Sequence, residues 1–287
     1  MAELHRSWLF SPGSHPDRCM KALASGADQT IWDLEDSVAM DLKEEARSRV
    51  RALLNTVHHR MPWVRVNPLT SDLGRRDVEQ VAPAVNVVAG RWVIPKADAA
   101  TARVLHSMRS QGCFDGELLL LIETAEGLSD LLDPRLRALW RSLAPARLAF
   151  GGLDLTEDLG GRTDGEDIYL FPRTQISLVS RVLGWPPPVD TVYPKIDDLP
   201  GLEESTRRGR RLGFAGKLII HPRQVEPVHG VFRPTSGELA WASEVMNAAA
   251  SSEGAVRVAG EMVDLPVIKA ARRILENFEG EQSEQPH

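Results

Sequence analysis

Two carboxylates follow apolar segments of this sequence at positions where they could share one cation. Glu123 comes directly after the apolar run 118–122, and Asp154 ends the segment RLAFGGLD at 147–154. If these segments are neighbouring parallel strands, about 4.8 Å apart, their terminal carboxylates meet at one point. Oxygen ligands without a His or Cys cluster favour a hard cation, with Mg²⁺ as the first choice and Mn²⁺ as the second. Spacing alone predicts equally well that both carboxylates pair with Lys or Arg.

A pair of glycines, Gly151 and Gly152, stands just before Asp154. Because glycine lacks a Cβ atom, the backbone can approach a ligand closely here, and its N–H groups can receive a carboxylate. We therefore expect both glycines to contribute to substrate binding.

Two arginines are candidates for binding a substrate carboxylate. Arg65 ends the segment WVRVN, and an arginine in that place can hold a carboxylate through two parallel hydrogen bonds. Arg6 begins an apolar segment instead of ending it, so its assignment is weaker. The alternative for each is an ion pair with Glu35 or Asp36, which are themselves expected to lie near the substrate.

Lys96 and His221 also end apolar segments. A lysine in such a place can form a Schiff base, but metal chemistry makes that unnecessary, and we expect Lys96 to pair with a carboxylate. His221 is expected to be a hydrogen-bonded structural residue in preference to a base. The sequence contains no P-loop, no nucleophile elbow, no HExxH and no dinucleotide fingerprint.

These residues need a scaffold that brings strand ends together. Short apolar segments alternate with helix-like ones such as 43–54 and 172–184, a pattern typical of parallel strands joined by helices. The predicted strands are 7–12, 30–36, 62–67, 91–96, 118–124, 147–154, 191–196 and 218–222. Eight such units favour an α/β fold of the TIM (β/α)8 barrel type, whose active site lies at the carboxyl ends of the strands. An open doubly wound sheet is the alternative.

The organisation along the chain predicts a barrel at 1–222 and a C-terminal helical extension at 223–287. The second segment is too long for one closing helix. We expect it to contact a neighbouring subunit.

Composition limits the partners of the protein. The 287 residues carry a net charge of −6, which argues against nucleic acid because phosphate binding needs a basic face. The longest apolar run is too short to cross a membrane, and the N-terminus lacks an apolar signal core. Cys19 and Cys113 form neither a metal-ligand pattern nor a disulfide framework. We expect a cytoplasmic protein without a membrane partner.

Several segments together resemble one known family. They include RSWLFSPGSHPDRCMKA (6–22), GADQTIWDLEDSV (26–38), VRVN (64–67), IPKAD (94–98), IETAEGL (122–128), LAFGGLDLTEDLG (148–160), GFAGKLIIHPRQV (213–225) and MVDLP (262–266). In this order they resemble the HpcH/HpaI aldolase and citrate lyase superfamily, in particular its citrate lyase beta-subunit-like branch, which is similar to malyl-CoA lyases.

The resemblance implies a TIM barrel that assembles as a homotrimer or hexamer. It assigns the Mg²⁺ ligands to Glu123 and Asp154, and the carboxylate of a 2-oxo acid to Arg65, with Glu123 also near the substrate. It implies that Asp264 of a neighbouring subunit acts as acid or base, and that Arg18 and Lys21 lie near a CoA tail. The segment VYPKI departs from the family pattern, since many relatives carry an aspartate near Lys195.

The function predicted from these residues is a carbon–carbon lyase that acts on a citryl-CoA or malyl-CoA type thioester. It would release a 2-oxo acid and an acyl thioester. Two alternatives remain at this point. One is a malyl-CoA thioesterase or a malate- or citramalate-synthase-like enzyme, and the other is a non-catalytic subunit of a lyase complex.

Overall fold

The computed structural model describes residues 5–57, 60–85, 90–112, 116–162, 166–250, 256–258 and 261–283. These residues belong to two units, His5–Val228 and the segment from His229 onward. The division after Val228 falls inside helix α10 (Val225–Phe232), whereas the sequence placed a boundary between 222 and 223. Cys113 lies outside the described residues.

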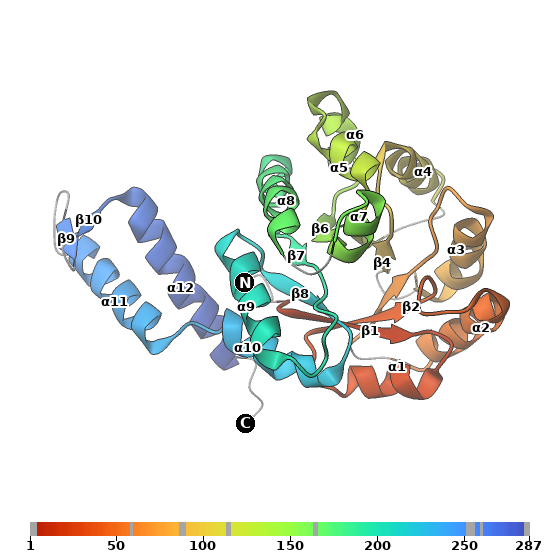
Figure 1. The fold of residues 1–287 in the computed structure, drawn as a ribbon, viewed down its shortest axis with the longest axis horizontal. Helices are drawn as coiled ribbons and strands as arrows, with labels where there is room; N and C mark the ends of the chain where they lie inside the picture. Colours follow the sequence, from red (N-terminus) through yellow and green to blue (C-terminus); the bar gives the residue numbers. More distant parts are fainter. Residues whose placement is uncertain are drawn as a thin grey trace. The chain divides into compact units, whose positions relative to one another are not determined.

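The first unit is a closed barrel of eight parallel strands, in the order in which they occur along the chain (Figure 1). This confirms the predicted (β/α)8 architecture. The strands are β1 (Ser7–Pro12), β2 (Gln29–Asp33), β3 (Trp63–Arg65), β4 (Arg91–Ile94), β5 (Glu117–Ile122), β6 (Ala146–Phe150), β7 (Val189–Asp190) and β8 (Gly216–Ile219).

Helices lie around the barrel and connect its strands (Figure 1). The α-helices are α1 (Pro16–Leu23), α2 (Lys43–Leu54), α3 (Asp72–Val85), α4 (Ala99–Ser110), α5 (Ala125–Leu132), α6 (Arg137–Arg141), α7 (Gly152–Asp158), α8 (Leu170–Leu183) and α9 (Leu199–Arg211). Short 3-10 turns are η1 (Met40–Leu42), η3 (Pro134–Leu136), η4 (Asp167–Tyr169) and η5 (Pro222–Gln224).

The predicted position of the seventh strand is wrong. The segment 191–196 is irregular, and β7 consists of Val189 and Asp190, which pair with β6 through Ala149 and with β8 through Gly216 and Lys217. Pro194 has no N–H to donate to a neighbouring strand, so the apolar segment around it could not extend the sheet. Lys195 is exposed in the loop after β7.

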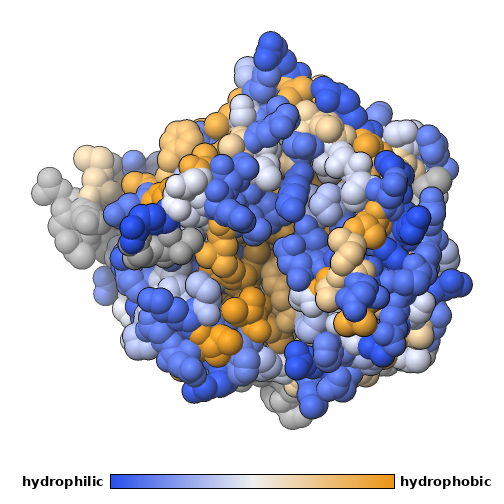
Figure 2. Space-filling model, turned by 45° about the vertical axis from the view of Figure 1, so that its right-hand side comes forward, coloured by the Kyte–Doolittle hydropathy of each residue, from blue (hydrophilic) through white to orange (hydrophobic). Residues whose placement is uncertain are grey.

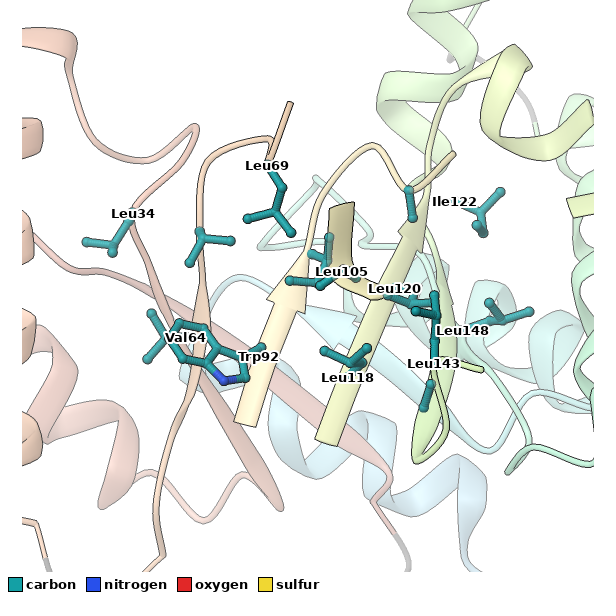
Figure 3. Close-up of a cluster of buried hydrophobic side chains, with 14 of the residues drawn as sticks. Leu34, Val64, Leu69, Trp92, Leu105, Leu118, Leu120, Ile122, Leu143 and Leu148 are labelled. Atoms are coloured by element: carbon teal, nitrogen blue, oxygen red, sulfur yellow. The ribbon is translucent and has the colours of Figure 1, made fainter. Parts of the chain in front are cut away.

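Alternation along the strands separates two apolar layers. One set of side chains fills the barrel: Trp8, Ile31, Trp63, Val93, Leu119, Leu121, Ala149, Val189 and Leu218. The other set faces the surrounding helices, and Figure 3 shows part of it, with Leu120 of β5 close to Leu105 of α4. A residue's position in this two-residue repeat therefore decides whether it faces the interior of the barrel.

The second unit contains two long helices, α11 (Ser236–Ala250) and α12 (Leu265–Ser283), together with the antiparallel pair β9 (Val256–Val258) and β10 (Glu261–Val263). Its small core is formed by Ala242, Val245, Val263 and Ala271. The sequence predicted a helical extension, and the helices confirm it. The antiparallel pair of strands was not predicted.

Figure 2 shows one face on which hydrophilic residues dominate and hydrophobic residues gather in a hollow near the centre. None of the helices within the described ranges has both the length and the apolar character needed to span a bilayer.

Candidate functional site

Glu123 lies directly after β5, at the carboxyl end of the barrel strands, and is 3% exposed. Its Oε1 accepts a hydrogen bond from the backbone N–H of Lys96 at 2.8 Å. Lys96 has a φ of 48°, in the left-handed region that non-glycine residues rarely adopt. The strained backbone that follows β4 therefore holds one of the two predicted metal ligands.

Asp154 is not at the end of a strand, as its sequence position had indicated. Strand β6 ends at Phe150, and Asp154 lies half-buried in the first turn of α7. It is still close enough to Glu123 for its charge to raise the pKa of Glu123, alongside burial and the charge of Glu35. The two predicted ligands thus belong to one electrostatic cluster.

Gly151 is required by the position of Glu123. A Cβ atom on Gly151 would lie 2.3 Å from the Cβ of Glu123 and 2.5 Å from its Oε2. The backbone N–H groups of the glycine pair are already used, since Gly151 donates to the carbonyl of Ile122 and Gly152 donates to Thr191 Oγ1. In this structure these N–H groups are bound within the chain, so a role of the glycine pair toward substrate stays a prediction, and the close approach that needs glycine is to Glu123.

Arg65, the last residue of β3, is held mainly by a residue that sequence reasoning missed. Asp33 of β2 accepts hydrogen bonds from Arg65 Nε at 2.6 Å and from Nη2 at 2.7 Å. Burial acts to raise the pKa of Asp33, but the charge and hydrogen bonds of Arg65 outweigh it, and this pKa lies below its usual value. Asp33 is thus ionised and fixes the plane of the guanidinium.

The remaining Nη1 of Arg65 faces the two carboxylates proposed from the sequence as its alternative partners. It lies 3.0 Å from Glu35 Oε2 and 3.3 Å from Asp36 Oδ2. Lys96 Nζ is 3.8 Å from Glu35 Oε1. The predicted ion pairs of Arg65 and Lys96 are therefore present at this end of the barrel.

Glu35 is a buried carboxylate with incomplete compensation. Both of its carboxylate oxygens are buried, and neither accepts a hydrogen bond from any residue that the structure describes, although Arg65 and Lys96 lie nearby. Burial, with the charges of Asp36 and Asp33, raises its pKa to about 7 against the opposing charge of Arg65. The positive charges of Arg65 and Lys96 therefore stabilise the ionised form of Glu35 only in part.

The loop after β2 that carries Glu35 is anchored by Lys43 of α2. The buried Lys43 Nζ donates to the carbonyl oxygens of Leu34 at 2.7 Å and Glu35 at 2.6 Å, and to Asn67 Oδ1 at 2.8 Å. All three ammonium donors are thus used. They tie this loop to the segment that follows Arg65.

The donor set fits a hard divalent cation. Burial raises the pKa of Glu123 and of Asp154, and neighbouring carboxylates, Glu35 for the former and Asp36 for the latter, raise them further. A cation placed between two such groups would stabilise their ionised forms. In the described part of the chain, no cluster of three or more His, Cys, Asp or Glu side chains is arranged to hold a metal. Water or substrate oxygens would have to complete a six-ligand shell around the two carboxylates.

Other predicted site residues lie elsewhere on the barrel. Arg6 precedes β1 and binds Asp28, with Nε 3.0 Å from Oδ2, so it lies at the amino ends of the strands and is not brought together with Glu123 and Arg65 at the carboxyl ends. Arg18 and Lys21 are exposed on α1, the helix that follows β1. His221 accepts a hydrogen bond from the N–H of Arg223 through Nδ1, which is the structural role expected for it.

Asp264 lies in the C-terminal unit, between β10 and α12. It is exposed, and its Oδ1 accepts a hydrogen bond from the N–H of Val267 at 3.3 Å, which caps the start of α12. Its neighbours Met262 and Leu265 are 65% and 62% exposed. An acid group is thus presented among exposed apolar side chains.

Three residues of this site were not singled out from the sequence: Asp33, Lys43 and Thr191. A signal existed for Asp33. It stands two positions after Ile31, whose side chain fills the barrel, so the two-residue repeat places Asp33 on the inner face. Lys43 binds the side chain of Asn67, and Thr191 binds the backbone N–H of Gly152, and no local sequence pattern predicts such contacts between distant segments.

The chain is similar to known proteins in sequence and in fold. A sequence model of the family described as HpcH/HpaI aldolase/citrate lyase matches residues 6–222. A citrate lyase subunit beta-like protein of Deinococcus radiodurans is 33% identical over 284 residues, which cover 95% of this chain and 96% of that protein. A (3S)-malyl-CoA thioesterase of Cereibacter sphaeroides is 32% identical over 285 residues, covering 96% of this chain and 94% of that protein.

Among solved structures, CitE of Mycobacterium tuberculosis in complex with magnesium, acetoacetate and coenzyme A is similar to this chain. The TM-score is 0.79 at 31% sequence identity, and the match covers 96% of this chain and 98% of that one.

Proposed function

We propose that this chain, which belongs to the HpcH/HpaI aldolase/citrate lyase family, is a magnesium-dependent carbon–carbon lyase. Its substrate would be a 3-hydroxy-3-carboxyacyl thioester of the malyl-CoA or citryl-CoA type. The products would be a 2-oxo acid and an acyl thioester. The observation that carries the proposal is the cluster of Glu123 and Asp154 beside Arg65 at the carboxyl ends of the barrel strands. The magnesium, acetoacetate and coenzyme A bound by the similar CitE support it.

Glu123 and Asp154 would hold the metal ion, Mg²⁺ in the first place and Mn²⁺ in the second. When bound, the ion supplies a Lewis acid that polarises substrate oxygens and offsets developing negative charge. Lys96 fixes the Glu123 carboxylate through its N–H, and Gly151 leaves room for the same side chain. The chain thus prearranges the ligands before substrate arrives.

Arg65 would bind the carboxylate of the substrate and so orient the bond that breaks. Asp33 occupies Nε and one side of Nη2, and therefore leaves Nη1 as the group that can exchange partners. A substrate carboxylate would take the place that Glu35 and Asp36 now hold beside Nη1. This exchange would align the substrate with the metal ligands, because an arginine fixed in place by Asp33 holds the carboxylate in one position.

Cleavage breaks the bond between the hydroxyl-bearing carbon and the carbon next to the thioester carbonyl. The hydroxyl passes its proton to solvent water, its oxygen becomes the carbonyl of the 2-oxo acid, and the bonding electrons pass to the thioester carbon as an enolate, so the one proton released balances the one that the enolate carbon later takes up. That carbon then needs a proton, which Asp264 of a neighbouring subunit would supply and would remove in the condensation direction. Arg18 and Lys21, exposed on α1, are the proposed contacts for the CoA tail.

The metal assignment is tested with Glu123→Gln and Asp154→Asn. The control for the first is Glu126→Gln, an exposed carboxylate on the following helix α5, and the control for the second is Glu157→Gln, an exposed carboxylate on α7 itself. Both site variants should lose Mg²⁺-dependent cleavage of malyl-CoA or citryl-CoA by about a hundredfold or more, because a catalytic cation loses a ligand. The two controls should cleave as the unmodified protein does. Unchanged cleavage by either site variant would refute the assignment.

A thioesterase is the second candidate, because a similar protein of Cereibacter sphaeroides is a (3S)-malyl-CoA thioesterase. The two activities differ in the sulfur product, which is an acyl thioester for a lyase and free CoA for a thioesterase. Measuring free thiol alongside 2-oxo acid formation separates them. Accumulation of acetyl-CoA with no free thiol supports the lyase.

The proposal includes assembly as a homotrimer or hexamer in the cytoplasm, since Asp264 would act on a neighbouring subunit. Sedimentation equilibrium measures the assembly directly. A protein that is active as a monomer would contradict the proposed role of Asp264.

A further inference from the structure

The start of α7 carries Asp154, and its position depends on contacts with two other strands. The Gly151 N–H donates to the carbonyl of Ile122 on β5 at 3.0 Å. The next N–H, that of Gly152, donates to Thr191 Oγ1 at 2.8 Å. Asp154 follows two positions later, so these bonds set where its carboxylate lies.

Thr191 satisfies a donor that the helix itself cannot satisfy. The first N–H groups of a helix have no carbonyl partner within it, and Gly151, which precedes α7, has no side chain that could cap them. Thr191 is 1% exposed and comes directly after β7. Its hydroxyl is thus an acceptor delivered from a distant part of the chain.

The contact between Gly152 and Thr191 leaves little space around Gly152. A Cβ atom on Gly152 would lie 3.0 Å from Thr191 Oγ1 and 3.1 Å from the ring of Phe150. On the other side of Gly152, Thr156 Oγ1 donates to its carbonyl oxygen at 2.7 Å. The peptide groups that lead into the turn of Asp154 are therefore fixed at both ends.

We infer that Thr191 is a positioning residue for the Asp154 carboxylate, and through it for a divalent cation held by Glu123 and Asp154. This inference rests on the proposed function, which assigns those two ligands. It adds a residue that touches neither metal nor substrate. Groups that orient a metal ligand typically change metal affinity about ten- to a hundredfold when they are removed.

The test uses Thr191→Val, which keeps the shape of the side chain and removes the hydroxyl, and Thr191→Ser, which keeps the hydroxyl. Thr206→Val is the matched control, because Thr206 is equally buried and its hydroxyl binds a helix carbonyl, that of Leu202 in α9. Mg²⁺ affinity is measured by calorimetry on the full chain without substrate, together with circular dichroism and Tm.

We expect the Kd for Mg²⁺ to rise about tenfold or more in Thr191→Val and to stay within about twofold in Thr191→Ser and Thr206→Val. If Thr191→Val does not fold, Thr191→Ala removes the same hydroxyl with less steric demand. An unchanged Kd in the hydroxyl-free variant, or an equal loss in Thr191→Ser, overturns the inference.

Asp154→Asn separates this failure from failure of the proposed function. If Asp154→Asn weakens Mg²⁺ binding and Thr191→Val does not, only the role of Thr191 is wrong. If Asp154→Asn leaves the affinity unchanged, the metal assignment fails and the role of Thr191 fails with it.

Discussion

Asp33 and Arg65 lie opposite each other on neighbouring strands β2 and β3 and form a two-fold hydrogen-bonded ion pair. Their Cα atoms are paired in the register of the sheet, and the two donor–acceptor distances are 2.6 Å and 2.7 Å. Asp33 also accepts the N–H groups of Glu35 and Ser37. One carboxylate therefore orients the guanidinium and shapes the loop beside it.

Asp33→Asn should weaken binding of a 2-oxo acid. The amide can accept only one of the two Arg65 bonds, and hydrogen bonds to charged groups contribute about 1.5–3 kcal/mol, which corresponds to roughly ten- to a hundredfold in Kd. Pyruvate titration in the presence of Mg²⁺ measures this. Glu203→Gln is the control, because Glu203 forms an exposed ion pair with Arg207 on α9 and takes no part in the site, and an exposed ion pair contributes at most about 1 kcal/mol. Equal affinities in the two variants would show that Asp33 has no such role.

Gly151→Ala should displace Glu123 and weaken Mg²⁺ binding. The added Cβ would stand 2.3 Å from the Cβ of Glu123, a distance that real structures do not show. Gly230→Ala is the matched control, because no atom lies within 4 Å of its added Cβ and alanine favours the helical state by about 1 kcal/mol. The measurement is the rise in Tm that Mg²⁺ produces. We expect a smaller rise in Gly151→Ala only.

The barrel was predictable from the sequence for two reasons. The strands carry apolar residues on both faces, and helix-like segments separate one strand from the next. The seventh strand was not predictable in the same way. Its two residues, Val189 and Asp190, follow a run of prolines, and the strand was predicted at the more apolar segment 191–196 instead. The pairing of β7 with its neighbours on both sides decides its position, and a local pattern does not contain that information.

The site was predictable where a charged residue directly follows a strand, as Glu123 does. Asp154 was identified, but its place on α7 depends on β6 ending at Phe150. The partner of Arg65 was misjudged, since Asp33, which ends β2 itself, binds it more closely than Glu35 and Asp36. Contacts such as those of Lys43 and Thr191 join segments far apart in the chain and emerge only with the tertiary structure.

The raised pKa of Glu35 predicts a pH-dependent stability of the metal-free protein. Burial raises this pKa from an ordinary value of 4.5 to about 7, so between these values the folded state binds more protons than the unfolded state. The free energy of unfolding should therefore fall as pH rises from about 4.5 to about 7, by at most about 3 kcal/mol from this group.

Urea unfolding at several pH values measures this decline. Glu35→Gln should make the decline shallower, while the exposed Glu126→Gln should leave it unchanged. Saturating Mg²⁺ should reduce the decline in the unmodified protein, since the cation stabilises ionised carboxylates. An equally steep decline in Glu35→Gln contradicts the prediction.

A second buried ion cluster should stabilise the fold without affecting the metal site. Asp190 of β7 binds Arg173 Nε at 2.8 Å and Lys217 Nζ at 3.0 Å, and all three side chains are almost fully buried. Asp190→Asn should lower the free energy of unfolding by about 3–5 kcal/mol, because the buried Lys217 loses its paired carboxylate and the buried Arg173 keeps only Glu166.

Chemical denaturation measures this loss, with Glu203→Gln as the control. Glu203 forms an exposed pair with Arg207, so its removal should cost about 1 kcal/mol at most. The Kd for Mg²⁺ should be the same in Asp190→Asn and the unmodified protein. A weaker Mg²⁺ affinity would show that this cluster extends to the active site.

Asp264→Asn separates the proposed catalytic role of Asp264 from its structural role. Asparagine caps a helix about as well as aspartate, so the bond to the N–H of Val267 and the Tm should be retained. Without an ionisable carboxyl group, turnover should fall by about a hundredfold or more, while Mg²⁺ affinity stays unchanged. Asp264→Ala should lose turnover to the same extent and also lose about 1 kcal/mol of stability with the cap.

Subunit mixing tests whether Asp264 acts on a neighbouring chain. Asp264→Asn subunits retain the metal ligands, and Asp154→Asn subunits retain Asp264, so a mixed oligomer contains sites in which both functions are intact. Random assembly of equal amounts should restore about a quarter of the original activity, because each half of a shared site is then intact in about half of the cases. If Asp264 acts within its own subunit, every site in the mixture lacks one group and no activity returns. Recovery after refolding the mixture, with each variant refolded alone as the control, therefore decides between the two arrangements.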